Sequence, residues 1–159
     1  MPVNHNPTPE LLPALCNCLA LRQAARRVTQ HYDQVLAPSG LKTTQFSVLA
    51  MLRRYQPISL GALAGHLVMD RATLGHNLRP LQRAGWVTLG AGADRRQKML
   101  TLTEVGAALL ADAGPLWRKA QDGFEAWFGA QAAGQLRVDL AIIAQMKPDR
   151  NIISNSVPE

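Results

Sequence analysis

Two short, closely spaced helices are the strongest structural signal in this sequence. Ser59 is a good N-cap for a helix over residues 60–67, where apolar side chains recur at the spacing of one helical face. Asp70 is a good N-cap for a second helix, in which three leucines at i, i+4 and i+7 share a face before Gly85 ends it. Because only three residues connect the two helices, the pattern predicts a helix-turn-helix.

A β-hairpin is expected directly after this helix pair. Residues 86–89 and 99–102 favour extended backbone, and the segment 90–97 between them is small, polar and basic. A hairpin in this position is called a wing. Thr103 then caps a further helix, which is expected to bend at residues 114–115, a Gly-Pro pair.

Longer helices flank the winged module on both sides. Apolar side chains recur at helical spacing over 10–36 and again over 104–147, while the proline-rich segment 1–9 and the polar tail 148–159 are expected to be flexible. The predicted fold class is therefore mainly α with a small β-hairpin wing, with a winged helix-turn-helix at 43–102. The flanking helices have too little core of their own, which favours a homodimer that packs them together.

The net positive charge of the chain belongs to the winged module. The whole sequence has 17 basic and 11 acidic side chains, a formal net charge of +6. Residues 43–102 hold eight of the basic and two of the acidic side chains, so the rest of the chain sums to zero. A local excess of this kind on a helix-turn-helix indicates a polyanionic partner, and double-stranded DNA is the partner we expect.

The second helix of the pair has an outward polar face. With its leucines turned inward, His76, Arg79 and Arg83 point outward, and arginine suits both guanine and phosphate. Arg71 adds a cation at the first turn, where backbone N–H groups favour phosphate, and Asn77 on the flank can reach a base. Taken alone, such a face is also typical of an ordinary solvated helix.

The tip of the hairpin carries the sequence Asp94-Arg95-Arg96. One arginine here can enter the narrow, negative minor groove beside a major-groove site. Asp94 is expected to pair with the other arginine and to hold the loop in shape. The alternative is a solvent-exposed hairpin with incidental charge.

Several segments resemble the MarR family of transcriptional regulators. They are residues 41–49 (LKTTQFSVL), 60–64 (LGALA), 70–74 (DRATL), 81–87 (LQRAGWV) and 94–96 (DRR), followed by 102–106 (LTEVG). The resemblance extends over about residues 11–147. It implies a winged-helix homodimer that binds a palindromic operator, usually as a repressor released by a small ligand or an oxidant.

The same resemblance assigns DNA contacts to individual positions. The recognition helix of the family meets the major groove at positions that correspond here to Arg71, Thr73, Leu74, His76 and Asn77, and Arg95 and Arg96 fall in the wing. Pro80 departs from a regular helix, at a cost of about 3 kcal/mol, and predicts a kink. The kink leaves open how far Arg83 shares the face of His76.

The effector has two competing interpretations. Cys18 resembles the reactive cysteine of organic-hydroperoxide sensors in this family, and Tyr32 matches one of the tyrosines that bind the thiol there. Arg22 stands where the other tyrosine is expected, and a cation beside a thiol favours the thiolate; alternatively, Cys18 is a small buried hydrophobe. The competing effector is a small aromatic carboxylate or phenol, held in an apolar pocket by Arg22 or Arg26.

Other function classes find less support. No cofactor motif, nucleophile elbow or metal-ligand spacing occurs, so we expect neither an enzyme nor a bound metal; a thiol peroxidase using Cys18 is the alternative enzyme. A winged helix that binds only protein is not expected to concentrate arginine on one face and on the wing. The sequence shows neither a leader segment nor an apolar run long enough to span a membrane, so a cytoplasmic protein is expected.

Overall fold

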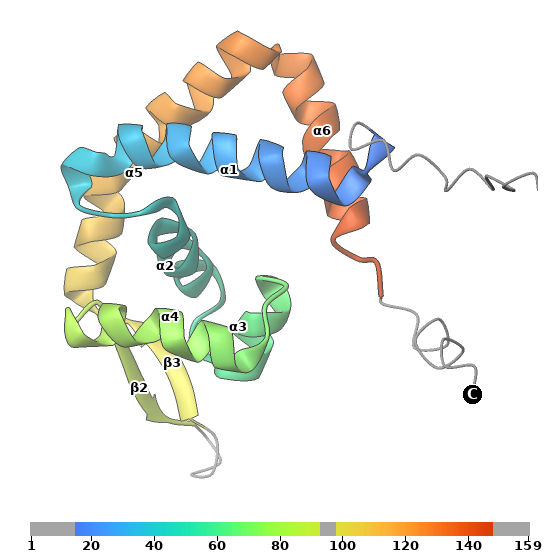
Figure 1. The fold of residues 1–159 in the computed structure, drawn as a ribbon. Helices are drawn as coiled ribbons and strands as arrows, with labels where there is room; N and C mark the ends of the chain where they lie inside the picture. The colour runs from blue at the N-terminus through green and yellow to red at the C-terminus, as the bar shows by residue number, and fades with distance from the viewer. Residues whose placement is uncertain (1–14, 93–97, 148–159) are drawn as a thin grey trace, which may run out of the picture.

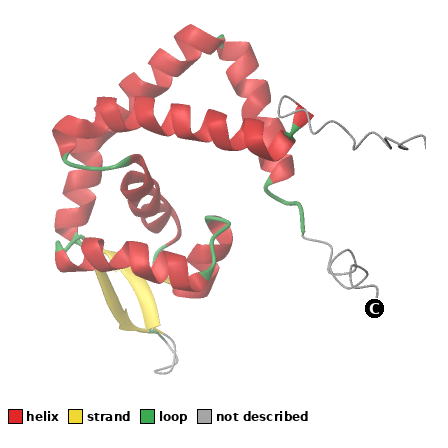
Figure 2. Cartoon of the chain, viewed as in Figure 1, coloured by secondary structure: helices red, strands yellow, loops and turns green. Residues whose placement is uncertain are grey.

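Helices form most of the structure, and a small sheet completes it (Figures 1 and 2). The computed structural model describes residues 15–92 and 98–147. In chain order the elements are α1 (Asn17–Leu36), the 3-10 helix η2 (Ala37–Ser39), α2 (Thr43–Tyr55), β1 (Ile58–Ser59), α3 (Leu60–His66), α4 (Arg71–Arg83), β2 (Val87–Ala91), β3 (Lys98–Leu102), α5 (Glu104–Phe128) and α6 (Ala130–Ile143). The predicted fold class, mainly α with a small β-hairpin wing, is confirmed.

The capping residues predicted for the winged module perform that role. The side chains of Ser59, Asp70 and Thr103 each accept a hydrogen bond from the backbone N–H three residues later, at the starts of α3, α4 and α5. An N-cap of this kind satisfies one of the N–H groups that a helix leaves unpaired at its first turn. The helix-turn-helix therefore begins and ends close to the predicted residues.

Three local features of the helices bear on the predictions. By residue type Thr43 or Thr44 is expected to cap α2, but the N-cap is Lys42 and Thr43 is already helical; the Asp33 carboxylate of α1 accepts a hydrogen bond from the Thr43 N–H at 2.7 Å. The first helix is described from Asn17 with Cys16 as its N-cap, and residues 10–14 of the predicted helix lie outside the described residues. Pro80 does not interrupt α4, which continues to Arg83.

The sheet is antiparallel in the order β1-β3-β2. The two predicted strands pair as the hairpin β2–β3, with Val87 opposite Leu102 and Ala91 opposite Lys98. The short strand β1 was not predicted, and its Ile58 lies opposite Leu100. This third strand ties the hairpin to the segment between α2 and α3.

A leucine-rich core joins the helix-turn-helix to α2, the sheet and the first part of α5. Its fully buried members include Leu36, Leu41, Leu49, Leu52, Leu63, Leu74, Leu81 and Leu100. Phe46 of α2 stacks on Trp117 of α5, with ring centroids 6.1 Å apart. The first part of α5 is therefore packed into the winged module, and the rest of this helix continues away from it.

The helices α1, α5 and α6 form an open, roughly triangular arrangement above the module (Figure 1). The ribbon of α5, a helix that contains Pro115, changes direction where its colour passes from yellow to orange (Figure 1). Large apolar side chains on or just after these helices are exposed in the single chain, among them Trp127, Val138, Ile142 and Met146. Within the described ranges, no helix has both the length and the apolar character needed to cross a membrane.

Candidate nucleic-acid interface

The start of α4 is capped by the carboxylate of Asp70. Asp70 accepts hydrogen bonds from both the backbone N–H and the hydroxyl of Thr73. The hydroxyl bond, followed by the backbone bond, lowers the pKa of Asp70 below its ordinary value, so the carboxylate is ionised at neutral pH. The Thr73 side chain stays exposed at the first turn, although its hydroxyl proton is already used by Asp70.

The outer face of α4 is basic and exposed. Arg71, His76 and Arg79 are all exposed, and Asn77 is half-buried, with its Nδ2 4.0 Å from Sδ of Met69. Leu74, in contrast, is fully buried in the core and cannot present its side chain to a ligand. The assignment of Leu74 to the contact surface is therefore wrong, because the leucine spacing that builds the helix-turn-helix turns this residue inward.

Arg71 is positioned by a glycine of the preceding helix. A Cβ atom added at Gly61 would lie only 2.8 Å from Nη2 of Arg71, so the guanidinium passes directly over the first turn of α3. Sequence reasoning did not single out Gly61, since a glycine inside a helix has no periodic signal of its own. The contact follows from the crossing of α3 and α4.

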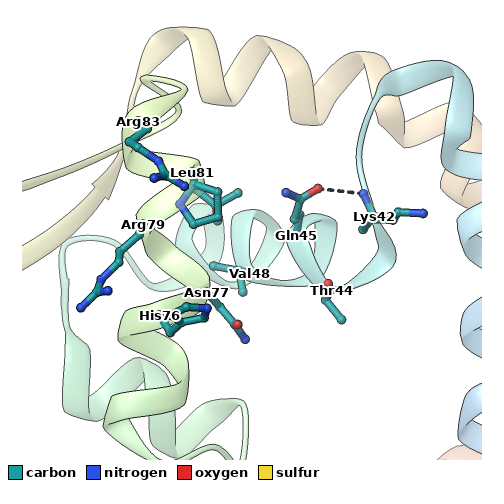
Figure 3. Close-up of a pocket in the computed structure, with 10 residues that line it drawn as sticks. Lys42, Thr44, Gln45, Val48, His76, Asn77, Arg79, Leu81 and Arg83 are labelled. Atoms are coloured by element: carbon teal, nitrogen blue, oxygen red, sulfur yellow. Dashed lines mark hydrogen bonds between the residues drawn. The ribbon is translucent and has the colours of Figure 1, made fainter.

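A groove of about 390 Å³ lies between α4 and the beginning of α2 (Figure 3). Its lining combines three cations, two amides, a hydroxyl and an imidazole with an apolar floor: Lys42, Thr44, Gln45, Val48, His76, Asn77, Arg79, Pro80, Leu81 and Arg83. Arg83 and His76 therefore line one side of α4 in spite of Pro80. The α2 residues of this groove were not predicted, and Lys42 precedes the basic segment 43–102 by one residue.

The wing contributes only its strands to the described surface. Strands β2 and β3 project away from α4 beyond the core (Figure 1). Asp94, Arg95 and Arg96 lie outside the described residues. Their predicted contact with a minor groove stays a prediction.

The residues predicted to sense an oxidant do not meet within one chain. Cys18 is exposed in the first turn of α1, so in the single chain it is not a small buried hydrophobe. Tyr32 donates its hydroxyl proton to Oε1 of Gln121. Fourteen positions of one helix separate Cys18 from Tyr32, which corresponds to about 21 Å. A contact between these two side chains would require a second copy of the chain.

The arginines predicted to hold an anionic effector also lie elsewhere. Arg22 and Arg26 are exposed on α1, and Arg26 borders a shallow groove together with the polar side chains of Gln23, Arg27 and Gln30. Such a surface lacks the apolar walls of a small-molecule pocket. The single chain therefore brings neither arginine into the expected arrangement.

An apolar pocket of about 470 Å³ is present instead between α1, α5 and α6. Its walls are mainly apolar, with Tyr32, Gln121 and Arg137 as polar members: Leu21, Ala24, Ala25, Val28, Tyr32, Gln121, Phe124, Ala133, Leu136, Arg137 and Leu140. Burial, and then the neighbouring Glu125 carboxylate, raises the pKa of Tyr32, so the phenol is protonated and donates. Glu125 accepts from Gln121 of the same helix at 2.8 Å and from Arg137 of α6 at 2.9 Å, and the bond from Tyr32 to Gln121 connects this network to α1.

Comparison with known proteins identifies transcriptional regulators as relatives. A family model described as the MarR family matches residues 41–98. The Bacillus subtilis HTH-type transcriptional regulator YwoH is 31% identical over 84 residues, which cover 53% of this chain and 61% of that protein. The chain thus aligns with about six tenths of the length of this relative.

Solved structures extend the similarity beyond the matched segment. The M. tuberculosis transcriptional regulator MosR, solved in complex with DNA, is 41% identical with a TM-score of 0.74, covering 82% of this chain and 94% of that one. The transcriptional repressor CouR was solved with a 23-mer DNA duplex, at 29% identity and a TM-score of 0.75 over 83% of this chain and 94% of that one. CouR was also solved with p-coumaroyl-CoA, at 27% identity and the same TM-score over 84% and 95%.

The winged helix-turn-helix with its basic face, the family match and the likeness to MosR over most of both chains agree with one another. The chain belongs to the MarR family of transcriptional regulators.

Proposed function

We propose that this protein is a homodimeric repressor that binds a palindromic DNA operator and is released from it by a small aromatic or phenolic ligand. The observation that carries the DNA-binding part is the exposed, basic surface of α4, to which Arg71, His76 and Arg79 contribute. His76 and Asn77 are suited to base edges, and the arginines to guanine or phosphate. The wing arginines, Arg95 and Arg96, are proposed to add a minor-groove contact.

Gel-shift and fluorescence-anisotropy titrations on the DNA that flanks its own gene test this proposal. His76→Ala should reduce the preference for the operator over unrelated DNA, because a base contact is lost, whereas Arg95→Ala should weaken both and reduce the salt dependence. Arg118→Ala, an exposed substitution on α5 remote from α4, is the control. Equal affinity of the wild type for all duplexes would contradict sequence-specific binding.

The dimer is supported by apolar surface on the long helices. Val138, Ile142, Ile143 and Met146 are between 46% and 76% exposed in the single chain, on or just after α6. Contiguous apolar surface of this kind marks an interface, and a symmetric operator requires a two-fold protein. Light scattering on the purified protein measures the mass, and a monomer at micromolar concentration would contradict this part of the proposal.

The ligand is proposed to occupy the apolar pocket between α1, α5 and α6. A volume of about 470 Å³ suits a small aromatic molecule, and the Tyr32 phenol with Gln121 supplies a polar end. CouR, a relative that binds p-coumaroyl-CoA, supports the class of ligand. A panel of aromatic acids and phenols, added to the preformed DNA complex, should include compounds that release the wild type and fail to release Leu136→Trp, which fills the pocket.

The accessibility of the N-terminal thiols favours a second candidate, a redox-sensing repressor. Cys16 and Cys18 are both free and exposed at the beginning of α1, within reach of an oxidant in solvent. In this case an organic hydroperoxide releases the wild-type protein from DNA, and Cys18→Ser binds DNA normally without being released. A wild-type complex that withstands hydroperoxide would remove this candidate and leave the aromatic ligand.

A further inference from the structure

We propose that the groove between the start of α2 and the recognition helix α4 binds a phosphate of the DNA backbone, so that α2 is part of the DNA-binding surface. This inference rests on the proposed DNA-binding function and extends it to residues that no sequence motif assigns. We call this site the α2–α4 groove, with the lining given above (Figure 3).

The charges around the α2–α4 groove suit an anion. Lys42 on one wall and Arg79 and Arg83 on the other supply three permanent cations, and the ten lining residues include no carboxylate. His76 adds a further donor. Figure 3 shows the Lys42 and Arg79 side chains extended away from one another, so these cations flank the groove, and the lack of a carboxylate among its lining residues favours a bound anion.

Lys42 is free to take part because its present ion pair is weak. Its Nζ lies 3.7 Å from Oδ2 of Asp33, and 71% of the side chain is exposed. The other oxygen of Asp33 already accepts from the N–H and the hydroxyl of Thr43, at 2.7 and 2.8 Å. Exposed pairs of this kind contribute little to stability, so a phosphate can compete for the ammonium group.

Gln45 provides a donor whose direction is set by the fold. Its Oε1 accepts a hydrogen bond from the Lys42 N–H at 2.9 Å, and Figure 3 shows the amide nitrogen on the opposite side, toward α4. Among the described residues, this Nε2 has no hydrogen-bond acceptor. Thr44, the next residue of the first turn, has an exposed hydroxyl that can also donate. The groove therefore has neutral donors as well as cations.

The position beside the recognition helix identifies the anion as a DNA phosphate. The α2–α4 groove shares His76, Asn77 and Arg79 with the face proposed to enter the major groove. The strand that borders the major groove carries its phosphates along the flank of an inserted helix, and half or more of protein–DNA hydrogen bonds go to phosphate and sugar. A phosphate contact fixes the register of the protein on DNA and does not read the sequence.

Two charge-removing substitutions, Lys42→Gln and Arg83→Gln, test the inference. Each should lower the slope of log Kd against log salt by about 0.9, so that the wild type loses about 3.5-fold more affinity than the variant between 50 and 200 mM salt. The loss of affinity at low salt should be the same factor on the operator and on an unrelated duplex. Lys119→Gln, an exposed charge on α5, is the matched control and should leave the slope unchanged.

The outcomes separate this inference from the proposed function. If the wild type binds DNA and both variants keep its salt slope, the proposed phosphate site is overturned and the proposed DNA binding stands. A loss confined to the operator also overturns it, because that result indicates base readout. A wild type that binds no duplex removes both proposals together. The melting temperatures of the variants and the wild type are compared first, to show that each variant is folded. If Lys42→Gln disturbs the start of α2, the salt slope of Arg83→Gln still tests the phosphate site.

Discussion

Gly106 makes the tightest backbone approach at the base of the wing, and we predict that Gly106→Ala destabilises the protein. A Cβ atom there would lie 2.2 Å from the carbonyl oxygen of Trp86, far inside the 3.4 Å at which ordinary contact begins. That oxygen accepts a hydrogen bond from the Thr103 N–H at 3.0 Å and cannot turn away without breaking it. The first turn of α5 must therefore shift by about 1 Å relative to the hairpin.

The size of the effect follows from one favourable and two unfavourable contributions. Alanine gains up to about 1 kcal/mol over glycine inside a helix, while overpacking costs about 1–3 kcal/mol and a weakened hydrogen bond adds about 1 kcal/mol. The expected net loss is about 2 kcal/mol, which lowers the melting temperature by about 4–8 °C in a chain of this size. Thermal unfolding followed by circular dichroism, at one protein concentration because a dimer is concentration-dependent, measures the shift.

Gly75→Ala is the matched control for this prediction. Gly75 lies inside α4, and nothing stands within 4 Å of a Cβ added there. The same substitution should therefore stabilise the protein by about 0.5–1 kcal/mol and raise the melting temperature. If Gly106→Ala melts at or above the wild type, the packing of α5 against the hairpin is not as described.

Three further predictions concern positions outside this contact. Gly61→Ala should displace the Arg71 guanidinium, which is the far end of a flexible side chain, so the melting temperature should change little. The slope of log Kd against log salt should fall by the amount expected for about one lost phosphate contact. An unchanged slope refutes a phosphate role for Arg71. At Asp33, burial raises the pKa, but the hydrogen bonds from Thr43 outweigh this effect and lower the pKa overall. The ionised carboxylate therefore stabilises the fold above about pH 4, and this contribution is lost as the pH falls through the folded-state pKa. The melting-temperature difference between wild type and Asp33→Asn should accordingly shrink from pH 7 to pH 3, and a constant difference contradicts the assignment. Ile142→Asp places a charge on a side chain that is 65% exposed in the single chain, and sedimentation should show a shift toward monomer; an unaltered mass refutes the role of this face.

The winged module was predictable because the interactions that define it are local. Caps at Ser59, Asp70 and Thr103 act over three residues, and leucine spacing acts over two turns of helix. The strands of the hairpin are neighbours in sequence, so their pairing was also predictable. The basic face of α4 followed from the same helical periodicity.

The errors arose where distant segments meet. Thr43 or Thr44 was expected as the N-cap of α2, yet Lys42 takes that position and the Asp33 carboxylate of α1 accepts from the Thr43 N–H. The strand β1 exists only because β3 passes beside it, and two residues carry no periodic signal. Cys18 and Tyr32 were grouped by resemblance; the length of α1 holds them apart within one chain, so their grouping stays a prediction about the dimer.

The sequence by itself determined the fold class, the location of the positive charge and the helix on which most of the candidate contact residues lie. Those properties depend on side chains within a few residues of one another. Only the tertiary structure decided that Leu74 is excluded from the surface, that Arg71 crosses Gly61, and that Gln45 lies across a groove from Arg83. These contacts depend on how helices cross, and the crossing is set by packing of a shared core that no single segment contains.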